Sequence, residues 1–233
     1  WGPNLIRNFS EISNSEMVAV ADLREDRLKS IKNLNHDLIV TSRYSDLFEM
    51  GLDGVVIATP PKTHHEIAKA ALDHGLNVMV EKPLTTCSQE AEELIELAAK
   101  KGLGLMVGHT FLFNNAVHAL KKLIYSGDLG KVLYIDTARL SLGLYQRGLN
   151  VLWDLAPHDL SILGFLLEKN PVSVEVFGTS CVLKDTHDVV HLNLVYPENI
   201  LAHVHVSWLA PVKVRRVTVV GSRKMAVYND IEA

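Results

Sequence analysis

The sequence is poor in features that would assign it to a specialised class of protein. Its 233 residues include only two cysteines, Cys87 and Cys181, in no Cys-x-x-Cys pattern. Two isolated cysteines provide neither a disulfide framework nor a metal motif, so we expect reduced thiols and a cytoplasmic protein. The longest apolar runs, such as Leu103–Val107, fall far short of the about 20 residues that a membrane-spanning helix needs, so no membrane association is expected.

An excess of charge of one sign is also missing. The 23 basic and 27 acidic residues give a net charge of -4, so no basic surface argues for nucleic-acid binding. The first residues contain neither a basic segment nor a long apolar stretch, so a secretory leader is not expected. With 48% hydrophobic and 21% charged residues, the composition is that of a globular protein with enough apolar material for a core.

The first half of the sequence alternates between short apolar runs and helical patterns. The apolar runs have the length of buried parallel strands; they are Met17–Ala21, Gly54–Ala58, Asn77–Val80 and Leu103–Val107. The helical patterns are Asn4–Asn14, Glu25–Leu34, Thr63–His74 and Ser88–Lys101. This alternation predicts an α/β domain of the Rossmann type, in which helices cover both faces of a parallel sheet.

The second half has a different rhythm. Long segments alternate apolar and polar residues, which is typical of an antiparallel sheet with one covered face; they are Val132–Leu142, Val172–Leu183, Val189–Val195, Leu201–Leu209 and Val214–Val220. Two helical patterns accompany them, Asn115–Tyr125 and Val151–Leu167. We therefore expect a dinucleotide-binding domain at residues 1–110 and, at residues 111–233, an α+β domain with a largely antiparallel sheet.

Two features of the first domain suit a dinucleotide. Gly2 and Pro3 begin a helix, where free backbone N–H groups bind phosphate. Asp22 ends the next predicted strand, where a carboxylate accepts hydrogen bonds from ribose hydroxyls. An ordinary helix start and a solvated acid remain an equal alternative, because the first two glycines of the nucleotide fingerprint are not in this sequence.

Two strand-end loops of the first domain could also carry function. Thr59-Pro60-Pro61 follows a strand where α/β sheets bind ligands, although a simple turn explains it on its own. Glu81-Lys82-Pro83 follows the next strand. There the Lys82 ammonium could stabilise a developing alkoxide or bind a substrate hydroxyl; the alternative is a surface lysine. His64 and His65 are adjacent in a helix and do not face each other, so they predict no metal site.

The second domain carries a carboxylate and an imidazole four residues apart. Asp154 and His158 share one face of a helix, so the acid can orient the imidazole as a general base. The alternative is a helix-start acid and a core histidine. His203 and His205 alternate on one strand without a third ligand, and we predict no metal site there. No Gly-x-Ser-x-Gly sequence marks a hydrolase.

Together these motifs resemble the Gfo/Idh/MocA family of oxidoreductases along essentially the whole chain. The matching residues are Trp1-Gly2-Pro3-Asn4, Asp22, Ala58-Thr59-Pro60-Pro61, Glu81-Lys82-Pro83, Gly108-His109 and Trp153–Asp159. Glu-Lys-Pro followed about seventy residues later by Asp-x-x-x-His is a fairly specific combination. Residues 108–115, 153–162 and 204–220 look most similar to the branch that acts on UDP-N-acetylated sugars and their uronic acids.

The resemblance implies a role for each matching residue. Cofactor contacts fall on Trp1, Gly2, Asp22, Arg24, Thr59, Pro60, His64, Glu81 and Lys82. The catalytic residues would be Lys82, Asp154 and His158, and the substrate contacts would be His109, Phe111, Arg139, Asn150 and His158. The Asp22 carboxylate favours NAD because it would repel the 2′-phosphate of NADP, whereas Arg24 nearby keeps NADP open.

The implied function is an NAD-dependent oxidoreductase that moves a hydride between a ring hydroxyl of a sugar, in particular a nucleotide sugar, and nicotinamide. Either Lys82 or His158 could be the formal base. One alternative is a non-catalytic sensor or scaffold that keeps the fold. The other is a polyol dehydrogenase of the inositol type, or an NADP-dependent enzyme of the same fold.

The resemblance also implies that this sequence lacks the family's opening strand and its last strands. We therefore expect the strands that end at Ala21 and Ala58 each to lack a neighbour. For the second domain we expect an exposed apolar sheet face formed by Val204, Val206, Trp208, Val217 and Val219. Such a patch usually marks an interface, which predicts a homodimer or a homotetramer built through this sheet.

Overall fold

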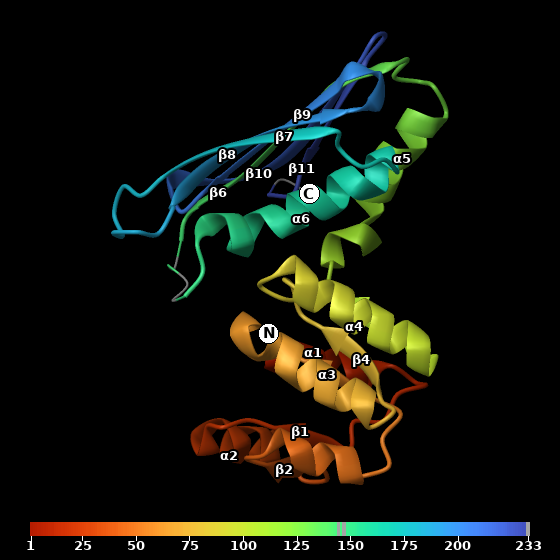
Figure 1. The fold of residues 1–233 in the computed structure, drawn as a ribbon, viewed down its shortest axis with the longest axis vertical. Coiled ribbons are helices and arrows are strands. Elements are labelled where there is room, and N and C mark those ends of the chain that lie inside the picture. Colours follow the sequence, from red (N-terminus) through yellow and green to blue (C-terminus); the bar gives the residue numbers. More distant parts are fainter. Residues whose placement is uncertain (144, 146–147, 232–233) are drawn as a thin grey trace. The chain divides into compact units, whose positions relative to one another are not determined.

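The computed structural model describes residues 1–143, 145 and 148–231. The chain divides into two compact units, residues 1–108 and 109–233, so the division falls two residues before the predicted boundary. Each unit has its own hydrophobic core. The two units are therefore described separately (Figure 1).

The first unit contains short parallel strands alternating with helices. The helices are α1 (Gly2–Glu11), α2 (Glu25–Leu34), α3 (His64–Asp73) and α4 (Ser88–Lys101), with the 3-10 segments η1 (Tyr44–Glu49) and η2 (Pro61–Thr63). The strands are β1 (Ala19–Ala21), β2 (Ile39–Thr41), β3 (Gly54–Ile57), β4 (Asn77–Val80) and β5 (Leu105–Val107). β1 pairs with β2, and β3, β4 and β5 form a second sheet; all of these pairs are parallel.

The core of the first unit lies between its three-stranded sheet and two helices. Ala68 and Leu72 of α3, Val80 of β4 and Leu94 of α4 are fully buried. Small alanines on α3 let this helix approach the sheet closely. Gly102 ends α4 in the left-handed conformation, with φ of 67°, which glycine adopts without steric cost. β1 and β3 do not pair with each other, as expected for two strands that each lack a neighbour.

The second unit is a six-stranded sheet with two helices on one face (Figure 1). The helices are α5 (Asn115–Tyr125) and α6 (Val151–Leu167), and the 3-10 segments are η3 (Thr110–Phe113) and η4 (Pro197–Asn199). The strands are β6 (Val132–Leu142), β7 (Ser173–Thr179), β8 (Val189–Tyr196), β9 (Ile200–Ser207), β10 (Leu209–Gly221) and β11 (Met225–Asn229). Their order is β11-β10-β6-β9-β8-β7, and only the β6–β9 pair is parallel. The predicted fold class, a Rossmann-type domain followed by a domain with a largely antiparallel sheet, is confirmed.

The prediction for the exposed face of this sheet is wrong. The five residues expected there are at most 2% exposed: Val204, Val206, Trp208, Val217 and Val219. They share one core with Ile162, Leu163 and Leu166 of α6 and with Val117 and Leu120 of α5. The two helices α5 and α6 therefore lie on the face that was expected to be exposed.

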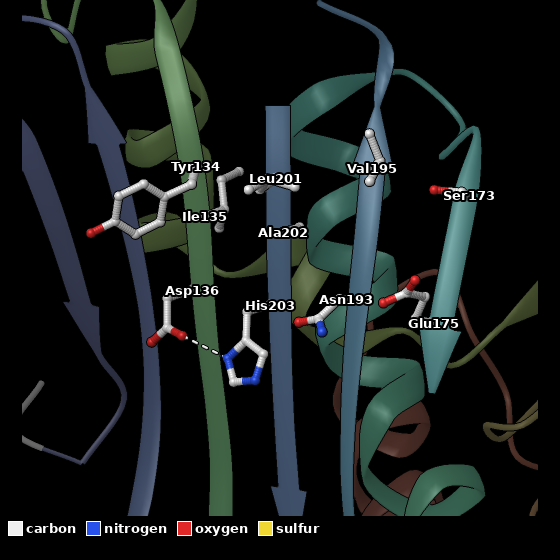
Figure 2. A pocket seen from close by; sticks show the side chains of 10 residues that line it. All are labelled: Tyr134, Ile135, Asp136, Ser173, Glu175, Asn193, Val195, Leu201, Ala202 and His203. Atoms are coloured by element: carbon white, nitrogen blue, oxygen red, sulfur yellow. Dashed lines mark hydrogen bonds and ion pairs between the residues drawn. The ribbon is translucent and has the colours of Figure 1, made fainter. Parts of the chain in front are cut away.

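The opposite face of the sheet carries the alternate residues of each strand. We call it the outer face; Figure 2 shows the part of it formed by β6, β9, β8 and β7. Tyr134, Leu201 and Phe177 on this face are 46%, 54% and 63% exposed. Among the described residues, no helix of the second unit packs against it. Within residues 1–143, 145 and 148–231, no helix is long and apolar enough to cross a membrane.

Candidate functional site

In the first unit, the predicted site residues follow the carboxyl ends of parallel strands. Glu81 comes directly after β4 and is 8% exposed, and its backbone N–H donates to the Ile57 carbonyl at 2.8 Å. The Gly108 N–H, after β5, donates to the Val80 carbonyl at 2.7 Å. A Cβ atom at Gly108 would lie 3.3 Å from the Glu81 carboxylate, so a glycine lets the two loops approach. The Glu81 carboxylate in turn accepts from the Lys82 backbone N–H at 3.3 Å.

His64 connects two of these strand-end loops. Its ring is 1% exposed; Nδ1 lies 2.8 Å from the Pro83 carbonyl and Nε2 lies 2.8 Å from the Thr59 carbonyl. The imidazole thus ties the loop after β3 to the loop that carries Lys82. Thr59 and Pro60 are themselves exposed. The sequence had suggested His64 as a cofactor contact, and the structure places it as a buried brace behind the two loops.

Asp22 lies at the carboxyl end of β1, next to two arginines. Its Oδ1 accepts from the Arg24 backbone N–H at 2.9 Å, and its Oδ2 lies 3.6 Å from Nη1 of Arg27. The Arg24 guanidinium turns instead to Asp26, at 2.5 Å, and this contact lowers the pKa of the Asp26 carboxyl. The arginine beside the Asp22 carboxylate is therefore Arg27, which sequence reasoning did not single out.

The start of α1 fits a phosphate group. Trp1 is the N-cap and is 69% exposed, and its side chain caps no N–H group of the helix. A Cβ atom added to Gly2 would meet nothing within 4 Å, so the space beside the first turn is open. Pro3 has no N–H group and the Asn4 N–H donates to the Trp1 carbonyl at 2.9 Å, so the Gly2 N–H is the donor of this turn available to a phosphate; Asp22 could hold a ribose. These residues fit a dinucleotide.

In the second unit, Asp154 is held by a buried tryptophan. The indole N–H of Trp208 donates to Oδ2 of Asp154 at 3.1 Å, and Trp208 is 1% exposed. Asp154 lies in the first turn of α6, whose N-cap is Asn150; the Asn150 side-chain oxygen accepts from the Trp153 N–H at 3.1 Å. Asn150, a predicted substrate contact, therefore begins the helix that carries Asp154 and His158.

His158 packs against an aromatic ring that is itself held by a cation. The His158 and Phe111 rings meet edge to face, with centroids 5.2 Å apart and planes at 74°. The Arg139 guanidinium lies over the Phe111 ring, 4.4 Å from its centroid. Arg139 also pairs with Asp159 through bonds of 2.9 and 3.3 Å, and the two residues are 6% and 1% exposed. Burial raises the pKa of the Asp159 carboxyl, and the charge of Arg139 opposes that rise.

The predicted residues thus fall into two groups, one in each unit. Thr59, Pro60, Glu81 and Lys82 lie in the strand-end loops of the first unit, and His64 begins α3. Phe111, Arg139, Asn150, Asp154 and His158 surround α6 in the second, and His109 is the N-cap of η3. Convergence of Lys82 and His158 on one substrate stays a prediction. Within the described ranges, no group of three or more His, Cys, Asp or Glu side chains is arranged to hold a metal ion.

Sequence reasoning missed two residues of the second group. Trp208 lies 54 residues after Asp154, and no local pattern links them. Asp159 gave a usable signal, because a carboxylate at a core-facing position of an apolar helix needs a buried partner. The buried partner of Asp159 is Arg139, which the sequence had suggested as a substrate contact. Its guanidinium contacts Asp159 and Phe111.

Comparison with known proteins identifies matches over both units. Residues 1–109 match a family profile described as "Oxidoreductase family, NAD-binding Rossmann fold", and residues 117–227 match the "GFO/IDH/MocA C-terminal domain". The chain is also similar to the structure of a protein classed as an oxidoreductase from Magnetospirillum magnetotacticum. This likeness has a TM-score of 0.87 at 31% identity and covers 99% of this chain and 74% of that one.

Relatives with assigned activities differ in what they act on. The chain is 28% identical to 2,7-anhydro-N-acetylneuraminate hydratase of Mediterraneibacter gnavus, over 85% of this chain and 56% of that protein. It is 29% identical to inositol 2-dehydrogenase of Rhodococcus erythropolis, over 75% of this chain and 51% of that protein. The WlbA dehydrogenase of Bordetella pertussis, solved with NADH and UDP-GlcNAcA, has the same fold, with a TM-score of 0.90 at 19% identity over 99% of this chain and 71% of that one. The chain spans about half the length of the curated relatives that it matches.

Proposed function

Because this chain belongs to the GFO/IDH/MocA family of oxidoreductases, we propose that it forms the cofactor and substrate domains of an NAD-dependent sugar dehydrogenase. The substrate class that we propose is a sugar with a free ring hydroxyl, and more narrowly a nucleotide sugar. One observation carries the proposal: Asp154, held by Trp208, lies one helical turn before His158, whose ring packs on Phe111. An acid and an imidazole supported in this way suit proton removal from a hydroxyl.

The first unit supplies the groups that would hold the dinucleotide. The Gly2 N–H at the start of α1 would bind its pyrophosphate, and Asp22 would accept from a ribose hydroxyl. Thr59, Pro60 and the Glu81-Lys82 loop, braced by His64, would line the nicotinamide half. When bound, nicotinamide supplies the hydride acceptor or donor. The carboxylate of Asp22 favours NAD over NADP, and Arg27 and Arg24 are the nearby cations that would act against this preference.

The second unit supplies the groups that would move the proton. A nitrogen of the His158 imidazole would take the proton of the reacting hydroxyl, and the Asp154 charge would favour the protonated ring. The Lys82 ammonium would donate a hydrogen bond to the same hydroxyl oxygen, which stabilises negative charge there as the proton leaves. His109 and Phe111 are the remaining candidates for substrate contact. Asn150 would act through the start of α6.

A polyol of the inositol type is the second candidate substrate. The similarity to inositol 2-dehydrogenase, 29% over 75% of this chain, supports it. The same proton chemistry serves a ring hydroxyl of either a sugar or a cyclic polyol, so the two candidates differ only in the substrate contacts. A non-catalytic scaffold is the alternative from a different class, and it has no need for Lys82, Asp154 and His158 together.

One set of titrations with the intact protein tests these possibilities. NADH and NADPH binding, followed by nicotinamide fluorescence, separates a cofactor-binding protein from a scaffold. Turnover is then measured with UDP-N-acetylglucosamine, its uronic acid and myo-inositol. The proposal expects NADH binding and turnover of a sugar nucleotide that falls about 10²- to 10⁴-fold in His158→Ala. Binding of neither cofactor, or near-normal turnover by His158→Ala, would contradict it.

We also propose that the outer face of the second-unit sheet binds a second copy of this chain. Six strands spaced at about 4.8 Å and roughly seven residues long give a flat area of about 600 Å², comparable with the roughly 800 Å² per partner of a stable interface. The face has a hollow of about 520 Å³. Figure 2 shows the side chains that line it, among them Asp136, Glu175 and Tyr134. Exposed Arg216 lies on the same face on β10, so the face carries charges of both signs for a symmetric pairing.

A further inference from the structure

A buried ion pair lies directly beneath the candidate base. Asp159 follows His158 in α6, and one residue along a helix turns the side chain by about 100°. The two side chains therefore leave the helix in different directions, and Asp159 is fully buried whereas His158 is half-buried. The Asp159 carboxylate meets Arg139 of β6 through two bonds of 2.9 and 3.3 Å. Their side chains are 1% and 7% exposed.

Stability alone does not account for this pair. Burial raises the pKa of the Asp159 carboxyl, which means that the surroundings penalise the charge that the pair requires. A buried ion pair is commonly no more stabilising than apolar residues of the same size, because removing both charges from water offsets their attraction. A geometric role explains the pair better: the planar, bidentate contact holds the guanidinium in one orientation.

The guanidinium in turn fixes an aromatic ring that contacts His158. The centre of the Arg139 guanidinium lies 4.4 Å from the Phe111 ring centroid, a cation–π contact. The Phe111 and His158 rings meet edge to face, with their centroids 5.2 Å apart. Each group in the series Asp159, Arg139, Phe111 and His158 thus contacts the next.

We propose that Asp159 and Arg139 are positioning residues, which hold the His158 imidazole in its working orientation through Phe111. This inference rests on the proposed function, in which His158 takes the proton. It also assigns Arg139 a task other than the substrate contact expected from the sequence. Catalytic geometry is sensitive at this level, since a displacement of about 1 Å can lower a rate about 100-fold.

A double variant tests the proposal without leaving an unpaired charge in the core. Arg139→Met/Asp159→Leu replaces both charges with apolar side chains of similar size, so the domain should fold. We expect kcat to fall about 10-fold or more with KM nearly unchanged, and the pH–rate profile to shift. The matched control is Lys169→Met/Glu198→Leu, which removes an exposed pair of the same unit and should leave kcat unchanged.

A second readout is independent of turnover. The ring ¹⁵N and ¹H signals of His158, assigned with His158→Ala, should shift or broaden in the double variant and in Phe111→Leu, but not in the control. Unchanged His158 signals together with an unchanged pH–rate profile would overturn the proposal. If the protein turns over no substrate while the His158 signals still change, the proposed function fails and the positioning role stands. If the double variant does not fold, Arg139→Lys takes its place, because it keeps the charge and loses the planar bidentate contact with Asp159.

Discussion

At the level of single residues, the candidate catalytic side chains of the site are supported by contacts with other side chains. Asp154 accepts the Trp208 indole N–H at 3.1 Å, and the Lys82 loop is tied through His64 to the loop at Thr59. Each support comes from a residue distant in the sequence. The chemistry proposed for Lys82 and His158 therefore depends also on the side chains that support them, Trp208 and His64.

The first prediction concerns the groups that handle the proton. His158→Ala and Lys82→Ala should each lower kcat about 10²- to 10⁴-fold, the usual effect of losing a general base or its partner, with a smaller effect on KM. Steady-state kinetics on the sugar nucleotide measure this. Asp154→Asn should cost less, because it keeps the Trp208 contact and removes only the charge. His36→Ala, an exposed histidine of the first unit, is the control; near-normal kcat in His158→Ala would refute the assignment.

The second prediction concerns cofactor choice. Asp22→Ala should remove most of the preference for NADH over NADPH, because a charge-assisted hydrogen bond and the repulsion of a 2′-phosphate are lost together. A contribution of about 1.5–3 kcal/mol for such a bond corresponds to roughly 10- to 100-fold in affinity. Fluorescence titration of both cofactors measures it, with Arg27→Ala expected to act in the opposite direction. Tighter binding of NADPH than NADH by the unmodified protein would contradict this prediction.

At the level of helices and strands, α6 is the element on which the second unit depends. It carries Asp154 and His158 towards the site and Ile162, Leu163 and Leu166 into the core. Its start is fixed by Asn150, whose side-chain oxygen accepts from the Trp153 N–H at 3.1 Å. The same element therefore serves packing and chemistry.

The third prediction follows from that cap. Asn150→Ala should destabilise the protein by about 1 kcal/mol, the usual cost of losing an N-cap side chain, and Asn150→Asp should not. Thermal and urea unfolding followed by circular dichroism measure the difference. If Asn150 contacts substrate instead, Asn150→Ala will raise KM while the unfolding midpoint stays unchanged, and the cap will not be its main role.

Strand prediction failed where the strands are short or marginal. β2 and β11 were not predicted: β2 has three residues, too few to show any period, and both lie at the end of their sheet order. Longer elements were predicted correctly, because a periodic pattern is recognisable only over many residues. Helix α6, for example, has the predicted bounds Val151–Leu167. The strand predicted at Val172–Leu183 is shorter in the structure, where β7 ends at Thr179.

For the whole molecule, the open question is assembly. The fourth prediction is that the intact protein forms a dimer, or a tetramer of dimers, through the outer face. Leu201→Glu on that face should shift the protein towards monomer, because an exposed residue on β9 would bring a charge into the interface. Ile39→Glu, at a comparably exposed position of the first unit, is the control. Sedimentation velocity measures this, and a monodisperse monomer at micromolar concentration would count against the interface.

The outer face also carries three clustered imidazoles. His191 and His205 are cross-strand partners with ring centroids 4.0 Å apart, and Nδ1 of His191 lies 3.3 Å from Nε2 of His203. His203 is paired with Asp136 at 2.9 Å; Glu175 and Arg216 are the other charged groups on this face of the neighbouring strands. Burial, and then the neighbouring imidazoles, lower the pKa of His191 and His205 from their usual 6.5.

The fifth prediction gives the consequence for pH. Because the folded pKa values are lowered, the unfolded chain binds protons at these positions first as the pH falls. Their full contribution to stability is therefore present above about pH 6.5 and is lost as the pH falls towards the lowered values. A second copy on this face would increase the desolvation, so self-association should weaken in the same range. Unfolding and sedimentation between pH 7.5 and about 5 measure this.

Variants of the two outer-face histidines test the pH prediction, and an exposed histidine elsewhere is the control. His191→Asn/His205→Asn should flatten the decline between pH 7 and 5, whereas His36→Asn should leave it as it is. An unchanged decline in the double variant would assign the pH dependence to other groups. A decline in stability without one in self-association would show that the outer face is not the interface.

Local sequence determined the elements, their order and the family of this protein, because periodicity and short motifs need only neighbouring residues. The tertiary structure alone decided which sheet face is covered. The alternation of apolar and polar residues does not say which face a helix covers. Burial of Val204 and Val217 became clear only from the core that they share with α5 and α6. Partners such as Trp208 and Asp154 are likewise brought together by folding, since a hydrogen bond depends on distance in space and not in the chain.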